Sequence, residues 1–265
     1  MPELITSRSN PLVKQIRLLQ QHKQRGASGL FLVEGLHPVG EAVAAGWKIE
    51  RLVYAPDLLT SDFGLRLLDE QSRRGIPLTA LSSDLFANVA GKDNPQGLLA
   101  LVHQRRLPLD YLKPERSFLA AACVSPQDPG NVGTILRTLE AVGAAGLFLL
   151  DGGVDPYHPS CIRASMGTIF WLPLVQASFE DFVSWARAHG VQLVGSSAHA
   201  SQDYRTFERS DRPTVLVLGS EQKGLSPEQL AVCDLSLSLP MRGRASSLNL
   251  AVAAGVLLYQ MIAKT

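Results

Sequence analysis

Polar side chains that could take part in chemistry gather in three stretches of the second half of the chain. The first, NVGTILR, runs from Asn131 to Arg137 and follows an apolar run that ends at Val124. We expect a helix here, on which Thr134 and Arg137 point away from the apolar face and toward the ends of the strands. An arginine at the mouth of a parallel sheet can bind a phosphate or polarise a hydroxyl. An exposed arginine on an amphipathic helix is an equally common interpretation of this stretch alone.

The second stretch is LVLGSEQKGLS. Gly219 and Gly224 let the backbone turn tightly and approach a ligand. Glu221 lies just past a buried strand, where it could accept hydrogen bonds from a ligand or fix the loop. The glycine spacing is that of a phosphate-binding P-loop, but Leu225 and Ser226 stand where Lys and Ser or Thr are required. The missing lysine argues against a nucleotide triphosphatase. No GxGxxG follows the first strand, so we expect no nicotinamide or flavin site.

The third stretch is LPMRGRASSLNLAVAA, which begins at Leu239. It predicts a loop and then a terminal helix over 247–262, with Ser246 and Ser247 at its start, because a serine hydroxyl accepts a hydrogen bond from a free amide of the first turn. Arg242 and Arg244 lie beside that helix start, where an anion or a nucleotide-like ligand could bind. A well-capped terminal helix with no ligand is the alternative.

Hydrophobic patterning predicts the elements that must position these stretches. In the first part of the chain we expect helices over 10–25, 35–45 and 61–74, and strands over 29–34, 49–54, 77–81 and 98–103. In the second part we expect strands over 118–124, 146–150, 169–175, 192–195, 215–218 and 235–239, and helices over 131–142, 179–188 and 247–262. Such alternation favours a parallel sheet that is covered on both faces and binds ligands at the carboxyl ends of its strands. We therefore predict an α/β domain over 1–104, a charged, proline-containing linker over 105–116, and a second domain over 117–265.

Composition and charge narrow the class of protein. The chain has 265 residues, of which 46% are hydrophobic and 18% charged, which is a globular composition. Its net charge of +1 gives no global sign of nucleic-acid binding, so any basic surface must be local. Residues 1–26 do carry a local excess of cations over the single acid Glu3: Arg8, Lys14, Arg17, Lys23 and Arg25. These side chains form either a solvated helix face or a contact with phosphate.

Several kinds of site and location are not expected. Cys123, Cys161 and Cys233 are far apart and have no metal-ligand spacing, so we interpret them as reduced thiols and predict no metal site. No apolar run is long enough for a membrane span, and the N-terminus lacks the apolar core of a signal peptide. These features favour a soluble, cytoplasmic protein. His158 and Arg163, near the predicted strand ends, either contact a ligand or are surface residues without a role.

Taken together and in this order, the three stretches resemble the motifs of the SpoU/TrmH family of RNA ribose 2′-O-methyltransferases. The earlier segments FLVEGLHPVGEAVAAGWKIERLVY and DNPQGLLALV are similar to the small substrate-binding domain that precedes the catalytic domain in many members. The resemblance implies a C-terminal parallel-sheet methyltransferase domain with a trefoil knot, an exception to the rule that chains do not thread, after a small α/β RNA-binding domain. It also implies a homodimer.

The resemblance further implies S-adenosylmethionine as the methyl donor, bound by Ser196, Gly219, Leu239, Met241 and Leu248. The catalytic residues that it implies are Arg137, Asn131, Glu221, Ser247 and Asn249. Arg137 would act as a general base or, as we prefer because a guanidinium is a poor base, would bind phosphate and stabilise the developing alkoxide. Asn249 would either contact the ribose and hold Arg137, or cap and brace the knot.

The implied substrate is ribosomal RNA, with transfer RNA as the alternative, and the sequence does not predict the target nucleotide. Two other classes remain open. A non-catalytic RNA-binding homologue would have no reason to keep Arg137 and Asn131. A methyltransferase that acts on a base nitrogen should show an acidic proton acceptor in place of the arginine.

Overall fold

The computed structural model describes residues 3–91 and 94–263 of the chain. Residues 1 and 265, the outer ends of the two predicted domains, lie outside the described residues. So does residue 93, the first residue of the segment DNPQGLLALV. The chain forms two compact units. The first ends at Arg105 and also contains Tyr157–Phe170, whereas the second contains Arg106–Pro156 and resumes at Trp171. The predicted boundaries at 104 and 117 stay a prediction, to which the structure adds that an internal segment packs with the first unit.

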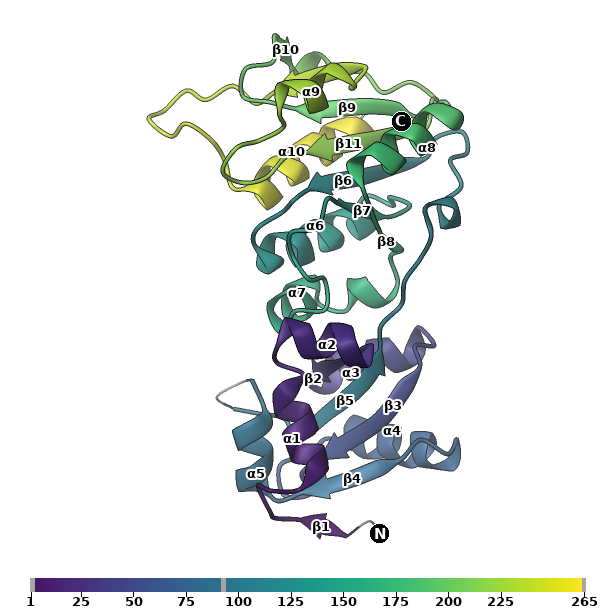
Figure 1. Ribbon diagram of the computed structural model, residues 1–265, viewed down its shortest axis with the longest axis vertical. Helices are drawn as coiled ribbons and strands as arrows, with labels where there is room; N and C mark the ends of the chain where they lie inside the picture. The colour runs from purple at the N-terminus through teal and green to yellow at the C-terminus, as the bar shows by residue number, and fades with distance from the viewer. Residues whose placement is uncertain (1–2, 92–93, 264–265) are drawn as a thin grey trace. The chain divides into compact units, whose positions relative to one another are not determined.

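The first unit is built on a five-stranded sheet (Figure 1). In spatial order its strands are β1 (Leu4–Ile5), β4 (Leu78–Leu81), β3 (Ile49–Tyr54), β5 (Leu98–His103) and β2 (Leu30–Glu34). β4 pairs in parallel with β1 and β3, while β5 is antiparallel to β3 and β2. The helices from the N-terminal part of the chain are α1 (Pro11–Leu18), α2 (His22–Ser28), α3 (Leu36–Ala44), α4 (Asp62–Arg73) and α5 (Ser83–Val89). This mixed sheet agrees with the predicted small α/β domain.

The predicted single helix over 10–25 is wrong, because α1 ends at Leu18 and α2 begins at His22. Asn10 does cap the first helix, since its side chain accepts a hydrogen bond from the Leu12 amide at 2.9 Å. The break is stabilised by Arg25, which is only 1% exposed. Its Nη1 donates to the carbonyl oxygens of Leu19 and Gln20, both at 2.9 Å, and so satisfies groups at the end of α1 that a longer helix would have paired internally.

The segment Tyr157–Phe170 contributes α7 (Pro159–Ser165) and the 3₁₀ turn η2 (Thr168–Phe170) to the first unit. Trp47 Nε1 donates to the carbonyl oxygen of Phe170 at 2.8 Å, and the rings of Phe31 and Tyr157 lie 4.5 Å apart. The predicted strand over 169–175 is therefore wrong at its start. The apolar run divides: Phe170 is buried in this aromatic cluster, and only the last residues of the run enter a strand.

The second unit is built on a seven-stranded sheet in which every pair of neighbouring strands is parallel (Figure 1). In spatial order its strands are β10 (Gln202–Asp203), β12 (Leu235–Ser238), β9 (Gln192–Ser196), β11 (Thr214–Leu218), β6 (Leu119–Val124), β7 (Leu147–Leu150) and β8 (Leu174–Ala177). Its helices are α6 (Pro129–Ala141), α8 (Phe179–Ala188), α9 (Pro227–Ala231) and α10 (Leu250–Ile262), with 3₁₀ turns η1 (Leu109–Tyr111) and η3 (Tyr204–Thr206). The predicted parallel sheet is confirmed.

The two faces of this sheet are covered by different helices. Alternate strand residues such as Ala122, Phe148 and Val217 pack against Phe182 and Trp185 of α8. α10 packs against α6 and β11. No helix within the described part of the chain has the length and apolar character needed to cross a bilayer. The sheet thus places the carboxyl ends of β12, β9, β11 and β6 side by side at one edge.

Candidate active site

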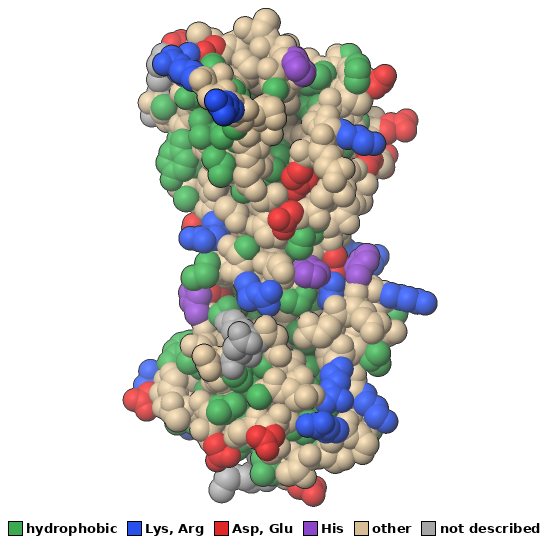
Figure 2. Space-filling model, turned by 90° about the vertical axis from the view of Figure 1, so that its left-hand side faces the viewer, with side chains coloured by type: hydrophobic (Ala, Val, Ile, Leu, Met, Phe, Trp, Pro, Cys, Tyr) green, Lys and Arg blue, Asp and Glu red, His purple; other side chains and the backbone are tan. Residues whose placement is uncertain are grey.

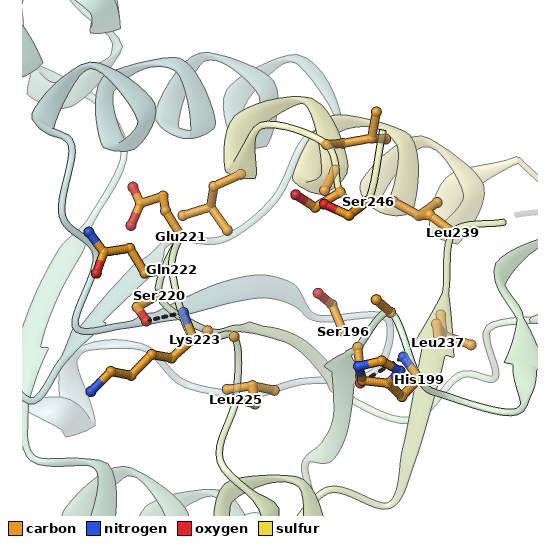
Figure 3. A pocket seen from close by; sticks show the side chains of 18 of the residues that line it. Ser196, His199, Ser220, Glu221, Gln222, Lys223, Leu225, Leu237, Leu239 and Ser246 are labelled. Carbon is orange, nitrogen blue, oxygen red and sulfur yellow. Dashed lines mark hydrogen bonds between the residues drawn. The ribbon is translucent and has the colours of Figure 1, made fainter. Parts of the chain in front are cut away.

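A pocket of about 530 Å³ lies in the second unit where the loops after β9, β11 and β12 meet the start of α10 (Figure 3). Its lining includes Ser196 and the three residues after it, the loop Gly219–Leu225, Leu237, Leu239, Met241, and the segment Ser246–Leu248. Figure 3 shows Ser196 on one side of the pocket and Ser246 on the other. All of these loops follow parallel strands, so the fold brings them to the same edge.

The loop after β11 folds back on itself. The Gly224 amide donates to the Ser220 carbonyl oxygen at 2.8 Å, and Gly224 has a φ of +66°, which a residue with a side chain rarely adopts. A Cβ on Gly219 would overlap the backbone of Gly224 and Leu225. Glycine is therefore required at Gly219 for the loop to close, and the closed loop presents its backbone to the pocket.

Glu221 connects this loop to the start of α6. Its Oε1 accepts hydrogen bonds from Asn131 Nδ2 at 2.9 Å and from the Asp128 amide at 3.1 Å, and its Oε2 accepts one from the Gln127 amide at 2.8 Å. Asn131 is 8% exposed. The carboxylate thus receives three donors, which is the arrangement expected for an ionised group that holds two loops together.

The pKa of the Glu221 carboxyl reflects these contacts. Burial by itself would raise the pKa, but the hydrogen bonds from Asn131 and from the backbone amides of Gln127 and Asp128 stabilise the charged form more strongly. The net result is a pKa below the ordinary value for a glutamate. Glu221 is therefore ionised at neutral pH, and it is better suited to fixing the loops than to taking up a proton.

Asn249 extends the network to α10. Its Nδ2 donates to Asn131 Oδ1 at 2.8 Å, while its Oδ1 accepts from the amides of Ala251 at 2.9 Å and Val252 at 3.3 Å. The helix therefore begins at Leu250, and the predicted start at Ser246 and Ser247 is wrong. Asparagine caps a helix as well as serine does, and only Asn249 also reaches Asn131.

The ten residues that the resemblance implied fall into three groups. Seven line the pocket: Ser196, Gly219, Glu221, Leu239, Met241, Ser247 and Leu248. Asn131 and Asn249 do not line it, but they join Glu221 in one chain of hydrogen bonds. Arg137 stands apart from both groups. It is exposed on α6, outside the pocket lining, and its side chain makes no hydrogen bond or ion pair within the described residues.

Three residues of the site were not predicted from the sequence. His199 lines the pocket, and the backbone amides of Gln127 and Asp128 donate to Glu221. The turn PQDPGN before α6 could have indicated the contacts of Gln127 and Asp128. Asp128 and Pro129 mark a helix start, and the free amides there need an acceptor. His199 has no such signal. Within residues 3–91 and 94–263, no group of three or more His, Cys, Asp or Glu side chains is arranged to hold a metal ion.

Comparison with known proteins gives two family matches. A sequence model of the SpoU rRNA Methylase family matches residues 119–259, and one of the MRM3-like substrate binding domain matches residues 10–100. The chain is 34% identical to a 23S rRNA (uridine(2479)-2'-O)-methyltransferase of Streptomyces viridochromogenes, over 97% of this chain and 91% of that protein. It is 33% identical to a 23S rRNA (guanosine(2553)-2'-O)-methyltransferase of Bacillus subtilis (strain 168), over 97% of this chain and 98% of that protein.

Solved structures with the same fold include complexes with the methyl donor. An AdoMet-bound rRNA methyltransferase from Sinorhizobium meliloti has a TM-score of 0.90 at 37% identity, and the match covers 97% of this chain and 96% of that chain. The SpoU methyltransferase AviRb from Streptomyces viridochromogenes, in complex with the cofactor AdoMet, has a TM-score of 0.85 at 33% identity, with 96% and 98% covered. Both matches span the first and the second unit.

Proposed function

This chain belongs to the SpoU rRNA methylase family, and from this membership we propose that it transfers a methyl group from S-adenosylmethionine to a ribose 2′-hydroxyl of ribosomal RNA. Its parallel sheet is that of the knotted methyltransferases of this family. The observation that carries the proposal is the hydrogen-bonded chain Glu221–Asn131–Asn249, which joins all three sequence stretches beside one pocket.

The substrate proposal is ribosomal RNA of the large subunit, acted on in the cytoplasm. Support comes from the two curated relatives, both of which are named for 23S rRNA. One is named for a uridine and the other for a guanosine, although each is about one-third identical to this chain. The identity of the methylated base is therefore not fixed by family membership, and we propose the class of RNA without the nucleotide.

The pocket fits S-adenosylmethionine. Its volume of about 530 Å³ lies within the range of roughly 300–1,000 Å³ that is typical of small-molecule sites. Leu237, Leu239 and Leu248 offer apolar contacts, and the loop closed by Gly219 offers backbone groups at close range. Ser196 adds a hydroxyl. We propose that Ser196, Gly219, Leu239, Met241 and Leu248 hold the cofactor, which when bound supplies an electrophilic methyl group.

The protein must position the ribose and stabilise the oxygen that attacks. We propose that Arg137 binds the phosphate next to the target ribose and stabilises the developing alkoxide, since its exposed guanidinium is free of protein partners within the described chain. Ser247, in the pocket lining, would hydrogen-bond the ribose or the cofactor. Glu221, Asn131 and Asn249 are positioning residues that hold the three loops in register. Such positioning can supply several kcal/mol of the barrier reduction.

We further propose that the protein is a homodimer that associates through α10. No residue of this helix is charged, yet Val252 is 52% exposed and Tyr259 is 55% exposed. A helix that is apolar on all sides normally has a partner on each of them. α10 packs against α6, the helix that carries Arg137. A second copy placed on α10 would therefore lie near the catalytic arginine of this chain.

Methyl transfer in vitro tests the proposal. Purified protein would be incubated with labelled S-adenosylmethionine and with the ribosomal and transfer RNA fractions of a strain that lacks the gene. We expect label at a ribose 2′-oxygen of ribosomal RNA, and its loss in the Arg137→Ala variant with cofactor affinity unchanged in calorimetry. Label in transfer RNA alone would replace the substrate proposal. Absence of both cofactor binding and label would overturn the enzyme proposal in favour of a non-catalytic RNA-binding protein.

A further inference from the structure

The first unit has a surface hollow that the candidate active site does not use. It lies between α1 and α2 and has a volume of about 360 Å³. The residues that line it are Pro11, Lys14, Gln15, Leu18, Leu19, Gln24 and Ser28. All seven come from the segment 11–28, so the hollow is made by the angle between two consecutive helices. The hollow is therefore formed by the basic segment near the start of the chain.

The angle between these helices is held from inside the unit. The buried Arg25 donates to the carbonyl oxygens of Leu19 and Gln20, where α1 ends. The backbone of Arg25 is held as well, because its carbonyl oxygen accepts a hydrogen bond from Gln104 Nε2 at 3.1 Å. The walls of the hollow are thus fixed by buried hydrogen bonds, and the hollow is pre-formed.

The lining of the hollow offers groups that can bind a ligand. Lys14 and Gln15 are exposed, and the side chains of Lys14, Gln15 and Gln24 make no hydrogen bond or ion pair within the described residues. Leu18 is 44% exposed and provides an apolar surface. The lining contains no acidic residue. The hollow therefore combines one ammonium, two amides that can each donate and accept, and an apolar wall.

The chain segment that forms the hollow is basic. Arg8, Lys14 and Lys23 are exposed and Arg17 is half-buried, whereas Glu3 is the only acid among residues 3–28. Arg17 Nη2 donates to Asn88 Oδ1 of α5, so this guanidinium is held at the surface. Figure 2 shows a group of Lys and Arg side chains on one face of the first unit. Because the net charge of the whole chain is only +1, this is a local concentration of positive charge.

We propose that the α1–α2 hollow binds a single-stranded segment of the RNA substrate, with Lys14 and Lys23 on its phosphates and one unstacked base in the hollow. The base would pack on Leu18, and the amides of Gln15 and Gln24 would hydrogen-bond its edge. Unstacked bases of single-stranded segments are what proteins read in RNA, because the grooves of an RNA duplex present little sequence information. The inference rests on the proposed function, which supplies RNA as the polyanion.

Binding of RNA to the full-length protein tests the surface without relying on catalysis. The probe is a fluorescein-labelled, single-stranded RNA of 20 nucleotides, followed by anisotropy over a range of salt concentrations. We expect Lys14→Ala/Lys23→Ala to raise the Kd roughly tenfold. The same variant should lower the slope of log Kd against log salt by about 1.4, because each phosphate that a lysine neutralises on a single strand adds about 0.7 to that slope. Gln15→Ala/Gln24→Ala should raise the Kd and leave the slope unchanged.

The matched control is Arg66→Ala/Arg74→Ala, which removes two exposed cations at α4 of the same unit. It should leave both Kd and slope unchanged. In the methyl-transfer assay, the lysine variant should raise the KM for ribosomal RNA several-fold and change kcat by less than about twofold.

Equal effects of the lysine and control variants, or an unchanged Kd in the lysine variant, would overturn the inference. Preferential binding of a 20-residue acidic peptide over the RNA would also overturn it, in favour of a protein partner. If the wild type methylates no RNA but the binding results are as expected, the α1–α2 hollow is still an RNA-binding site and only the proposed methyl transfer is wrong.

Discussion

At the scale of single residues, Glu221 is the group on which the site depends most. Its carboxylate accepts hydrogen bonds from Asn131 and from two backbone amides, and these bonds hold its pKa below the ordinary glutamate value. A group whose pKa is lowered by folding contributes stability above its unfolded pKa of about 4.3, and this contribution is lost as the pH falls through the folded pKa.

We therefore predict that Glu221→Gln lowers the free energy of unfolding by about 1–3 kcal/mol at pH 7, because the amide of glutamine places a donor where donors already point. The difference from the wild type should shrink as the pH falls below about 4. Urea unfolding at a series of pH values measures it. Glu115→Gln, which makes the same change at an exposed position of the second unit, should have little effect. A difference that grows in acid would show that Glu221 is not held as an anion.

Asn249 has two roles that substitution can separate. Its Oδ1 caps α10, whereas its Nδ2 binds Asn131. Serine can keep the cap but cannot reach Asn131. We predict that Asn249→Ala is less stable than Asn249→Ser by about 1 kcal/mol, while both lose methyl transfer to a similar extent. Thermal unfolding and methyl-transfer rates on the two variants test this. Full activity in Asn249→Ser would mean that Asn249 is only a cap.

At the scale of elements, the loop after β11 requires glycine at Gly219, since a Cβ there would overlap the backbone of Gly224 and Leu225. We predict that Gly219→Ala opens this loop and weakens S-adenosylmethionine binding at least tenfold, which is about 1.4 kcal/mol. Calorimetry on the purified variant measures the loss. The control is Gly243→Ala, where an added Cβ meets no atom within 4 Å. Equal affinities of wild type and Gly219→Ala would place the cofactor elsewhere.

The secondary-structure elements also show what the sequence could and could not predict. The parallel sheet was predictable because its strands, such as β6 and β11, are apolar throughout and thus typical of strands buried on both faces. The division of the apolar run 169–175 was not predictable, because periodicity does not show that Phe170 is buried in the first unit while the end of the run enters a strand. The start of α10 was missed because Ser246, Ser247 and Asn249 are all good caps, and only the bond to Asn131 favours the last.

The candidate site, like the fold, was predictable only in part. Glycine and carboxylate positions at strand ends pointed to Gly219 and Glu221, which line the pocket. The position of Arg137 outside the pocket lining was not predictable, because the helix pattern gives only the face on which an arginine lies. Nor does a sequence show that Arg25 is buried and divides the first helix, since arginine is usually a surface residue.

At the scale of the whole molecule, the exposed apolar face of α10 predicts self-association. Tyr259→Arg should convert the proposed dimer into a monomer, because it would bury an unpaired charge between the copies. Sedimentation velocity of the wild type and the variant tests this. Tyr111→Arg is the matched control, since Tyr111 is 54% exposed and Tyr259 55%. A wild type that stays monomeric at micromolar concentration would contradict the proposed dimer.

The proposed methyl transfer is best examined by mapping ribose methylation in the ribosomal RNA of the organism, with and without the gene for this protein. We predict that one 2′-O-methyl group disappears when the gene is deleted. It should return with the wild-type gene but not with the Arg137→Ala gene. Identical maps with and without the gene would show that this protein is not a ribose methyltransferase of ribosomal RNA.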